Sequence, residues 1–345
     1  MGALLVCALS NNAFAELKLL SSQKEQRGSA YAKMISKSNH SYWVTVDNAD
    51  SKPSLRLYKF TDVDFRNRNL VGLSYTPILM ATGEQHGLLA GMNARGDWGI
   101  SQFNEKETKE QKHTELKSML IVKEIAVAGQ NYIIAGRNNE DFPVLLLVGD
   151  DLRVKREIKL SGQRKGEVSS VFNTFGSTFA VLSFEDGSAE LLNLSPNFSI
   201  LNKVNIAGSA AKGIALKAGG FAVTYSSGQD VLIEKLDSQF RPIWKIKTHT
   251  RSGVTTLNYV LCELQDGIGL VGANNGRLMV VRVNSAGTNF RKTEDDFSGL
   301  LSPAEEYYSV DVLQNNIHIR GISRKKDSLV DGNSTSFHFV ESTTP

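Results

Sequence analysis

The chain has 345 residues, of which 41% are hydrophobic and 22% are charged, the composition of an ordinary globular protein. Its formal net charge is only +3, and Lys and Arg are interspersed with Asp and Glu, so the electrostatic footprint of a nucleic-acid-binding protein is absent. With only 7 prolines and a large apolar fraction, wholesale disorder is excluded and a large buried core is expected.

The N-terminal segment has the features of a signal peptide. An uncharged apolar run leads to Ala13-Phe14-Ala15, which fits the small-x-small pattern that signal peptidase cleaves. We therefore expect a signal peptide over residues 1–15, cleavage after Ala15, and a mature protein that is periplasmic or secreted. The alternative is a buried N-terminal strand or helix, because the run is too short to span a bilayer.

The two cysteines predict no internal disulfide in the mature protein. Cys7 lies in the segment expected to be removed, and lipidation of Cys7 is an alternative although Val6 is bulkier than the residue that usually precedes a lipidated cysteine. Cys262 lies in an apolar, strand-like run and is expected to be a small buried hydrophobe. Elsewhere no apolar stretch reaches membrane-spanning length, so no transmembrane segment is predicted.

Residues 16–345 read as one unit repeated seven times. The second strand of each unit is marked by an anchor residue, and the anchors follow one another at steps of 42 to 49 residues, within the range of propeller blades. The anchors are Trp43, Leu88, Tyr132, Phe179, Phe221, Ile268 and Ile317. Residues 179–194 align with residues 221–236 without a gap, and Phe198 then falls on Phe240.

Each unit is expected to contain four short strands. An apolar segment before each anchor predicts an innermost strand, at residues 31–35, 77–80, 119–122, 168–172, 213–216, 257–261 and 308–313. A turn follows the second strand, at residues 47–51, 93–97, 138–141, 185–188, 226–229, 274–277 and 323–327. A fourth strand of alternating polarity comes after the third, for example at residues 154–160 and 243–247. Four antiparallel strands per unit make a propeller blade.

The seventh unit has no fourth strand of its own, because the chain ends soon after residues 336–341. Residues 16–20 alternate in polarity at the start of the mature chain, and we expect them to pair with the strand that contains Phe337 and Phe339 and so to remove an exposed edge. The predicted fold class is therefore all-β: a single domain over residues 16–345 that forms a seven-bladed β-propeller of four-stranded antiparallel blades, closed by the N-terminal strand. A linear solenoid is the alternative, and it would need polar capping units.

The fifth unit carries Gly219-Gly220-Phe221, then Lys235-Leu236-Asp237, then Ile243-Trp244-Lys245. Over residues 219–247 it resembles the repeats of secreted bacterial β-propellers. In those repeats a Gly-Gly-aromatic strand is followed by Lys-Leu-Asp and then by a strand with an apolar residue before Trp. This unit departs from the pattern at Leu232, where the family has a further Trp. The resemblance implies a propeller fold and export. It implies no site residues, because these are positions at which blades pack and such propellers serve many functions.

Motifs of known catalytic chemistry are absent from the sequence. It contains no His-Glu-x-x-His, Gly-x-Ser-x-Gly or Walker A motif and no cysteine pair with zinc spacing. The six histidines are scattered through different units, which predicts isolated histidines in place of a metal site. We therefore predict no catalytic residue, no metal and no cofactor.

We expect function to reside in the turns between second and third strands, because equivalent turns of successive blades share one rim and loops carry binding residues. The candidate ligand-binding residues are Arg95, Asp97, Asn138, Asn139, Glu140, Asp141, Asn274, Asn275 and Arg277. The leading hypothesis is an exported, non-enzymatic propeller that binds a protein or glycan partner there. The alternative is a glycan-active hydrolase or lyase whose site is assembled across blades at the central funnel. Neither hypothesis involves nucleic acid, and the oligomeric state stays open.

Overall fold

The computed structural model describes the backbone of residues 17–342 except for residues 26–28, 38–39, 48–52, 62–63, 71–72, 83–86, 94, 105–108, 175, 250–258, 275–276, 296–307, 314–315 and 328–331. Side chains are described between residues 73 and 293, with gaps, and at four positions between residues 312 and 319. The expected signal peptide lies outside the described residues. Within the part of the chain that is described, no helix is long and apolar enough to cross a membrane.

The described backbone is all-β, and its strands form seven four-stranded antiparallel sheets. The first sheets in chain order contain β2 (Ser29–Lys37), β3 (His40–Asp47), β4 (Pro53–Thr61) and β5 (Asp64–Leu70), then β6 (Thr76–Thr82), β7 (Gly87–Met92), β8 (Trp98–Asn104) and β9 (Lys109–Glu115). The next contain β10 (Met119–Ala128), β11 (Asn131–Asn138), β12 (Pro143–Val148) and β13 (Val154–Lys159), then β14 (Gly166–Thr174), β15 (Ser177–Phe184), β16 (Ala189–Leu194) and β17 (Ile200–Ile206).

The remaining sheets follow the same pattern. They contain β18 (Ser209–Ala215), β19 (Phe221–Ser227), β20 (Asp230–Leu236) and β21 (Pro242–His249), then β22 (Val260–Leu264), β23 (Gly267–Asn274), β24 (Arg277–Asn284) and β25 (Phe290–Asp295). In the last sheet β26 (Tyr308–Leu313), β27 (Asn316–Asp327) and β28 (Gly332–Ser342) are joined by β1 (Leu17–Glu25).

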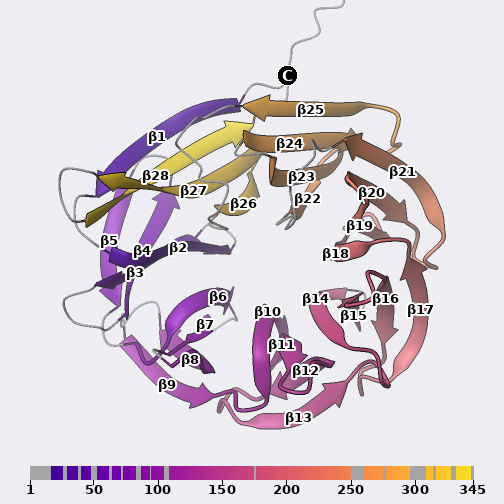
Figure 1. The fold of residues 1–345 in the computed structure, drawn as a ribbon, viewed down its shortest axis with the longest axis horizontal. Helices are drawn as coiled ribbons and strands as arrows, with labels where there is room; N and C mark the ends of the chain where they lie inside the picture. The colour runs from indigo at the N-terminus through magenta and orange to yellow at the C-terminus, as the bar shows by residue number, and fades with distance from the viewer. Residues whose placement is uncertain are drawn as a thin grey trace, which may run out of the picture.

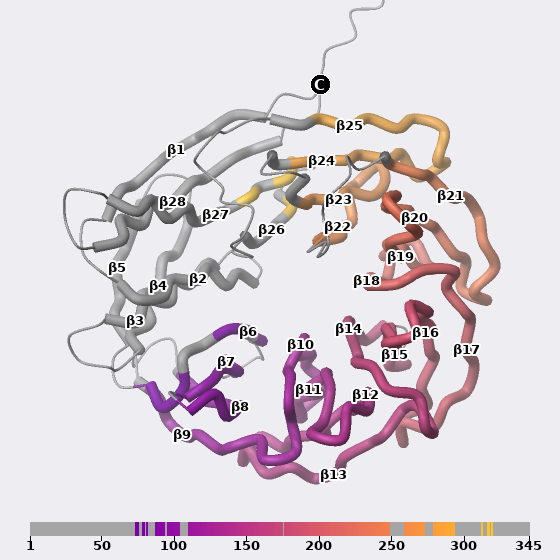
Figure 2. Tube along the Cα trace, in the orientation of Figure 1, coloured from indigo at the N-terminus to yellow at the C-terminus, as the bar shows by residue number. Residues whose placement is uncertain are grey.

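Five of the sheets, from β6 to β25, are described with side chains and are consistent with propeller blades. Figure 1 shows them following one another around a central axis, with the first strand of each innermost and the fourth outermost. Figure 2 shows the described parts of these sheets, in colour, arranged along an arc. Each sheet is a simple up-and-down meander, so sheets are joined by the connection from a fourth strand to the next first strand.

The middle strands are apolar on both faces because both faces are covered by neighbouring sheets. In β11, Ile134 belongs to a cluster with residues of the preceding sheet, whereas Ile133 belongs to a cluster with residues of the following sheet. In β12, Leu145 and Leu146 divide in the same way. This two-sided burial explains why these strands read as continuous apolar runs in the sequence, while the outermost strands are mostly exposed.

The turn between third and fourth strands has the same conformation in three successive sheets. It places one large apolar residue in the left-handed region, at Leu152 (φ 63°), Phe198 (φ 62°) and Phe240 (φ 65°). We call this residue the plug. The plug N–H donates to the carbonyl three residues earlier, over 2.8 to 3.1 Å. The predicted correspondence of Phe198 with Phe240 is thus confirmed.

Burial of the plug offsets its backbone strain. A left-handed conformation costs a non-glycine residue roughly 1–2 kcal/mol. Phe240 is only 5% exposed, and its ring centroid lies 5.3 Å from that of Phe221 and 6.1 Å from that of Phe179. The plug therefore fills the junction between its own sheet and the preceding one.

In sheet β22–β25 the plug position is occupied by Gly287, which also has a left-handed φ of 74°. A Cβ at Gly287 would lie 2.5 Å from Cγ of Trp244, a residue of β21 in the preceding sheet. The indole Nε1 of Trp244 donates to the carbonyl of Ser285 over 3.1 Å. Here the large side chain comes from the other side of the junction, and glycine leaves room for it.

Two details of the predicted repeat are wrong. In the ladders Thr178 lies opposite Leu194 and Phe221 lies opposite Leu236, so Phe221 corresponds to Thr178 and not to Phe179. The turn between second and third strands is one residue shorter in the later sheet, and a one-residue shift exchanges the two faces of a strand. Residues 323–327, predicted as a turn, belong to β27, in which Asp327 still pairs with Gly332 of β28.

Replacing Phe240 by Ala should lower the free energy of unfolding by about 3–5 kcal/mol, the usual cost of emptying a core aromatic site. Phe290, the first residue of β25, is 39% exposed and provides the matched control. Phe290→Ala should change stability by only about 0.5 kcal/mol. Urea denaturation of the full chain measures both, and equal losses would contradict the role of the plug.

Candidate functional site

The turns of the array lie on two rims. Because successive strands run in opposite directions, turns between second and third strands share one rim with the connections between sheets. We call this rim I. The turns between first and second strands and between third and fourth strands lie on the other, which we call rim II. The eight described residues among the nine predicted site residues lie in turns of rim I or at the strand ends beside them.

The turn between β11 and β12 is held by Asn138. Its Oδ1 accepts hydrogen bonds from the N–H groups of Glu140 (3.1 Å) and Phe142 (2.9 Å), and the side chain is buried. Asp141 has a left-handed φ of 68°. Asn139 is exposed, and its Nδ2 donates to the carbonyl of Lys117 over 2.8 Å. The amide oxygen of Asn138 therefore holds the turn, while its neighbours form the surface.

An arginine links this turn to the equivalent turn of the next sheet. Nη1 of Arg137 lies 3.6 Å from a carboxylate oxygen of Asp141 and 3.4 Å from one of Glu185. Lys165, in the connection between the two sheets, pairs with Asp141 at 3.3 Å, and its carbonyl accepts the N–H of Glu185. Glu140 forms an ion pair with Lys159 of β13. Exposed pairs contribute only about 0–1 kcal/mol each, so this network orders a charged surface more than it stabilises the fold.

The other predicted residues are placed separately. Arg95 pairs with Asp97 at 3.4 Å within one turn, and among the described residues no hydrogen bond or ion pair joins that turn to residues 138–142. Asn274 and Arg277 lie opposite each other at the end of the β23–β24 ladder, and their side chains are outside the description. Asn275 lies outside the described residues. Of the predicted residues, the structure thus brings together the four of the β11–β12 turn, residues 138–141. Through Arg137, this turn is joined to Glu185 of the β15–β16 turn.

Arg164, also in the connection between sheets, was not predicted. Its guanidinium lies 3.6 Å from the centroid of the Phe184 ring and donates to Asp186 and Glu190, each over 2.9 Å. Hydrogen bonds from Ser188, and then from Arg164, lower the pKa of Asp186 to about 2. Nothing in the local sequence around Arg164 marks it, because its partners lie 20 or more residues away. A groove of about 480 Å³ runs beside these residues toward the exposed start of β17.

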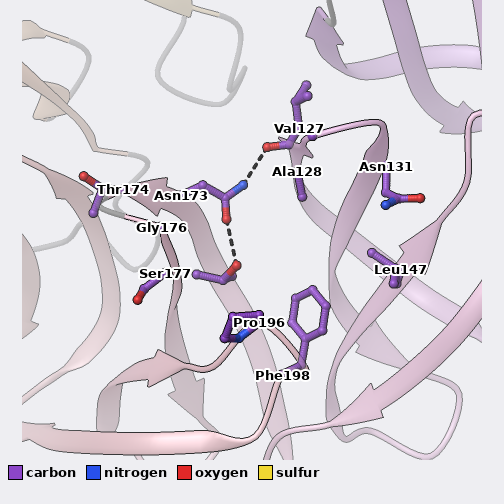
Figure 3. Close-up of a pocket in the computed structure, with 12 residues that line it drawn as sticks. Val127, Ala128, Asn131, Leu147, Asn173, Thr174, Gly176, Ser177, Pro196 and Phe198 are labelled. Atoms are coloured by element: carbon purple, nitrogen blue, oxygen red, sulfur yellow. Dashed lines mark hydrogen bonds between the residues drawn. The ribbon is translucent and has the colours of Figure 1, made fainter.

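A second pocket, of about 450 Å³, opens on rim II where sheet β10–β13 meets sheet β14–β17. Figure 3 shows its walls: the two neighbouring turns between first and second strands, and Pro196 and Phe198 from the turn before β17. Asn173 bridges the sheets, since its Nδ2 donates to the carbonyl of Val127 (2.6 Å) while its Oδ1 accepts from the Thr178 hydroxyl (2.8 Å). The sequence-based hypothesis missed this pocket entirely.

The described side chains do not assemble a metal site. No group of three or more His, Cys, Asp and Glu among them is arranged to hold a metal ion. His113 lies 3.6 Å from a carboxylate oxygen of Glu110 and packs edge-on against Tyr75. Cys262 is half-buried in β22, beside the apolar cluster that contains Ile317.

No family model matches the chain, and no curated protein does. Among solved structures, the chain is similar to a protein from Lactobacillus plantarum, with 12% identity and a TM-score of 0.55 over 88% of this chain and 93% of that one. It is also similar to a protein of unknown function from Bacteroides caccae, with 14% identity and a TM-score of 0.46 over 78% and 92% of the two chains. At this level of identity the similarity to the Lactobacillus protein shows a fold alone: an all-β array of four-stranded sheets like propeller blades.

Proposed function

We propose that residues 16–345 form one closed seven-bladed propeller. Two observations support closure. β1 pairs antiparallel with β28, so that Ser21 lies opposite Phe339 and Gln23 opposite Phe337, the strand expected to receive the N-terminus. β2 contacts both β26 and β6, as expected if the first complete sheet lies between the last sheet and the next one. We expect Leu17, Leu19 and Leu20 to be buried by this pairing, and their side chains lie outside the described ones.

We further propose that this propeller is an exported, non-enzymatic scaffold that docks a protein partner on rim I. The observation that carries the proposal is the link made by Arg137 between Asp141 of one turn and Glu185 of the next. It fixes exposed charges of both signs in one pattern across two sheets, and complementary charge patterns give specificity and fast association. On the same rim, the docking surface would be extended by the remaining predicted site residues, Arg95, Asp97, Asn274, Asn275 and Arg277.

Asp186 and Asp237 are unsuited to act as the acid of the alternative function, a glycan hydrolase or lyase. A glycosidase needs one carboxyl group with a raised pKa as general acid. The pKa of Asp186 is lowered to about 2, and the backbone N–H of Arg241 lowers that of Asp237. These two carboxyls are held ionised, which suits them to charged contacts and not to proton donation.

Export is tested by N-terminal sequencing of the protein made in a Gram-negative host. The apolar run followed by Ala13-Phe14-Ala15 predicts that the recovered mature chain begins at Glu16. A matched variant with Ala15→Asp should accumulate uncleaved, because signal peptidase requires a small residue there. Soluble cytoplasmic protein that retains Met1 would contradict export.

Docking on rim I is tested with a photo-reactive amino acid at Glu140, an exposed position of the β11–β12 turn. The matched control carries it at Asn197, an exposed position of rim II. Ultraviolet irradiation of intact cells should give a discrete cross-linked protein from position 140 and not from position 197. With that protein purified, Glu185→Lys should weaken binding about tenfold and reduce its salt dependence.

A partner cross-linked equally from both positions, or a purified partner that binds Glu185→Lys unchanged, would show that rim I is not the docking surface.

A further inference from the structure

One small residue accounts for the pocket on rim II. In each sheet, one residue of the second strand lies opposite the last paired residue of the third strand. That position holds Tyr132 in β11, Thr178 in β15 and Phe221 in β19. Tyr132 is 5% exposed and Phe221 is 1% exposed, and each packs in the cluster shared with the preceding sheet. Thr178 has no ring, so its junction is left partly empty.

The plug of the same sheet is only partly buried as a result. At the next junction Phe240 is enclosed by the rings of Phe221 and Phe179. At the pocket the corresponding positions hold Thr178 and Ile133, and Phe198 is only half-buried on the pocket wall. The pocket is therefore a local departure from a repeat that fills this space elsewhere.

The pocket wall is polar but uncharged. None of its 12 lining residues is Asp, Glu, Lys, Arg or His. Asn131, Thr174 and Ser177 supply amide and hydroxyl groups, while Phe198 and Leu147 supply apolar surface. Hydroxyl and amide groups can both donate and accept hydrogen bonds.

The polar groups are held in fixed orientations. Lys155 donates to Oδ1 of Asn131 over 2.7 Å, which sets the direction of that amide and turns its Nδ2 donor away from the lysine. Asn173 is fixed at both ends of its amide, by the bond from its Nδ2 to Val127 of the preceding sheet and by the bond that its Oδ1 accepts from Thr178 of its own sheet. A ligand would therefore meet groups that are already ordered, which reduces the entropy lost on binding.

This chemistry selects a class of ligand. A cationic ligand would lose water without meeting an opposite charge among the lining residues, and an anionic one would find only Lys155, which is already bonded to Asn131. A purely apolar ligand would leave the amides and hydroxyls unpaired. A pyranose ring has hydroxyl groups around its edge and an apolar face that can lie on an aromatic ring. A volume of about 450 Å³ is within the range of small-molecule pockets and has room for one or two such rings.

We propose that the rim II pocket binds one or two rings of a neutral saccharide, with Phe198 as the stacking surface and with Asn131 and Ser177 as hydrogen-bonding groups. The site lies on the rim opposite the docking surface, so this inference does not depend on the proposed function.

The test is saturation-transfer NMR and calorimetry on the full chain, with the monosaccharides and disaccharides of glucose, galactose, mannose and N-acetylglucosamine as probes and digalacturonate as the charged comparison. We expect at least one neutral probe to bind. Thr178→Phe restores the ring found at Phe221 and should weaken that binding by about tenfold or more while leaving the melting temperature unchanged or higher. Phe198→Leu should also weaken binding.

Phe240→Leu is the matched control, because it makes the same change at the equivalent buried turn. Leucine fits this turn, as Leu152 shows, so both plug variants should fold. The control should bind the neutral probe like the unmodified chain. The proposal is wrong if no neutral probe binds at millimolar concentration, if digalacturonate binds more tightly, or if binding survives both Thr178→Phe and Phe198→Leu.

Discussion

The packing of each sheet against both of its neighbours is the constraint on which the rest of the structure depends. The middle strands carry apolar side chains on both faces, as at Ile133 and Ile134, and neither face can be left to water. Burying one such side chain contributes about 1.5–3 kcal/mol, and the described sheets repeat this burial at every junction. In such an array the outer faces of the first and last sheets also need covering, and this is the physical argument for the closed ring that we propose.

The same constraint explains where the candidate sites lie. Rings fill the junctions at Tyr132 and Phe221, and the strained plug residues complete them, so these positions serve stability. Thr178 breaks the pattern and leaves the pocket on rim II. On rim I the exposed residues of the turns are not needed to fill a junction between sheets. Arg137 can therefore pair there with carboxylates of two sheets, Asp141 and Glu185. Both proposed sites thus lie at positions where the packing pattern of the repeat is not required.

Much of the fold could be predicted from the sequence, because two-sided burial produces continuous apolar strands that repeat at a regular spacing. The errors in the predicted repeat arose where the lengths of turns and strands set the register of the strand pairs. Phe179 and Phe221 begin similar strings of residues, yet a turn shorter by one residue sets them on opposite faces. Residues 323–327 are polar enough for a turn but extend a long strand. The pocket could not be predicted, because it results from a ring missing at Thr178, and the shifted alignment hid that position. Arg137 and Arg164 form ion pairs with residues of turns that are distant in the sequence. The spacing of residues along the chain does not reveal such pairs.

Closure is the central claim, and two truncations of the chain that begins at Glu16 test it most directly. One removes residues 16–25 and with them β1, while the other removes residues 343–345, which lie beyond the last strand. Loss of β1 exposes the edge of β28, so thermal denaturation should show a melting temperature several degrees lower and more aggregation, while the second truncation should melt like the parent. Equal and negligible effects of the two truncations would mean that the N-terminal strand does not close the array.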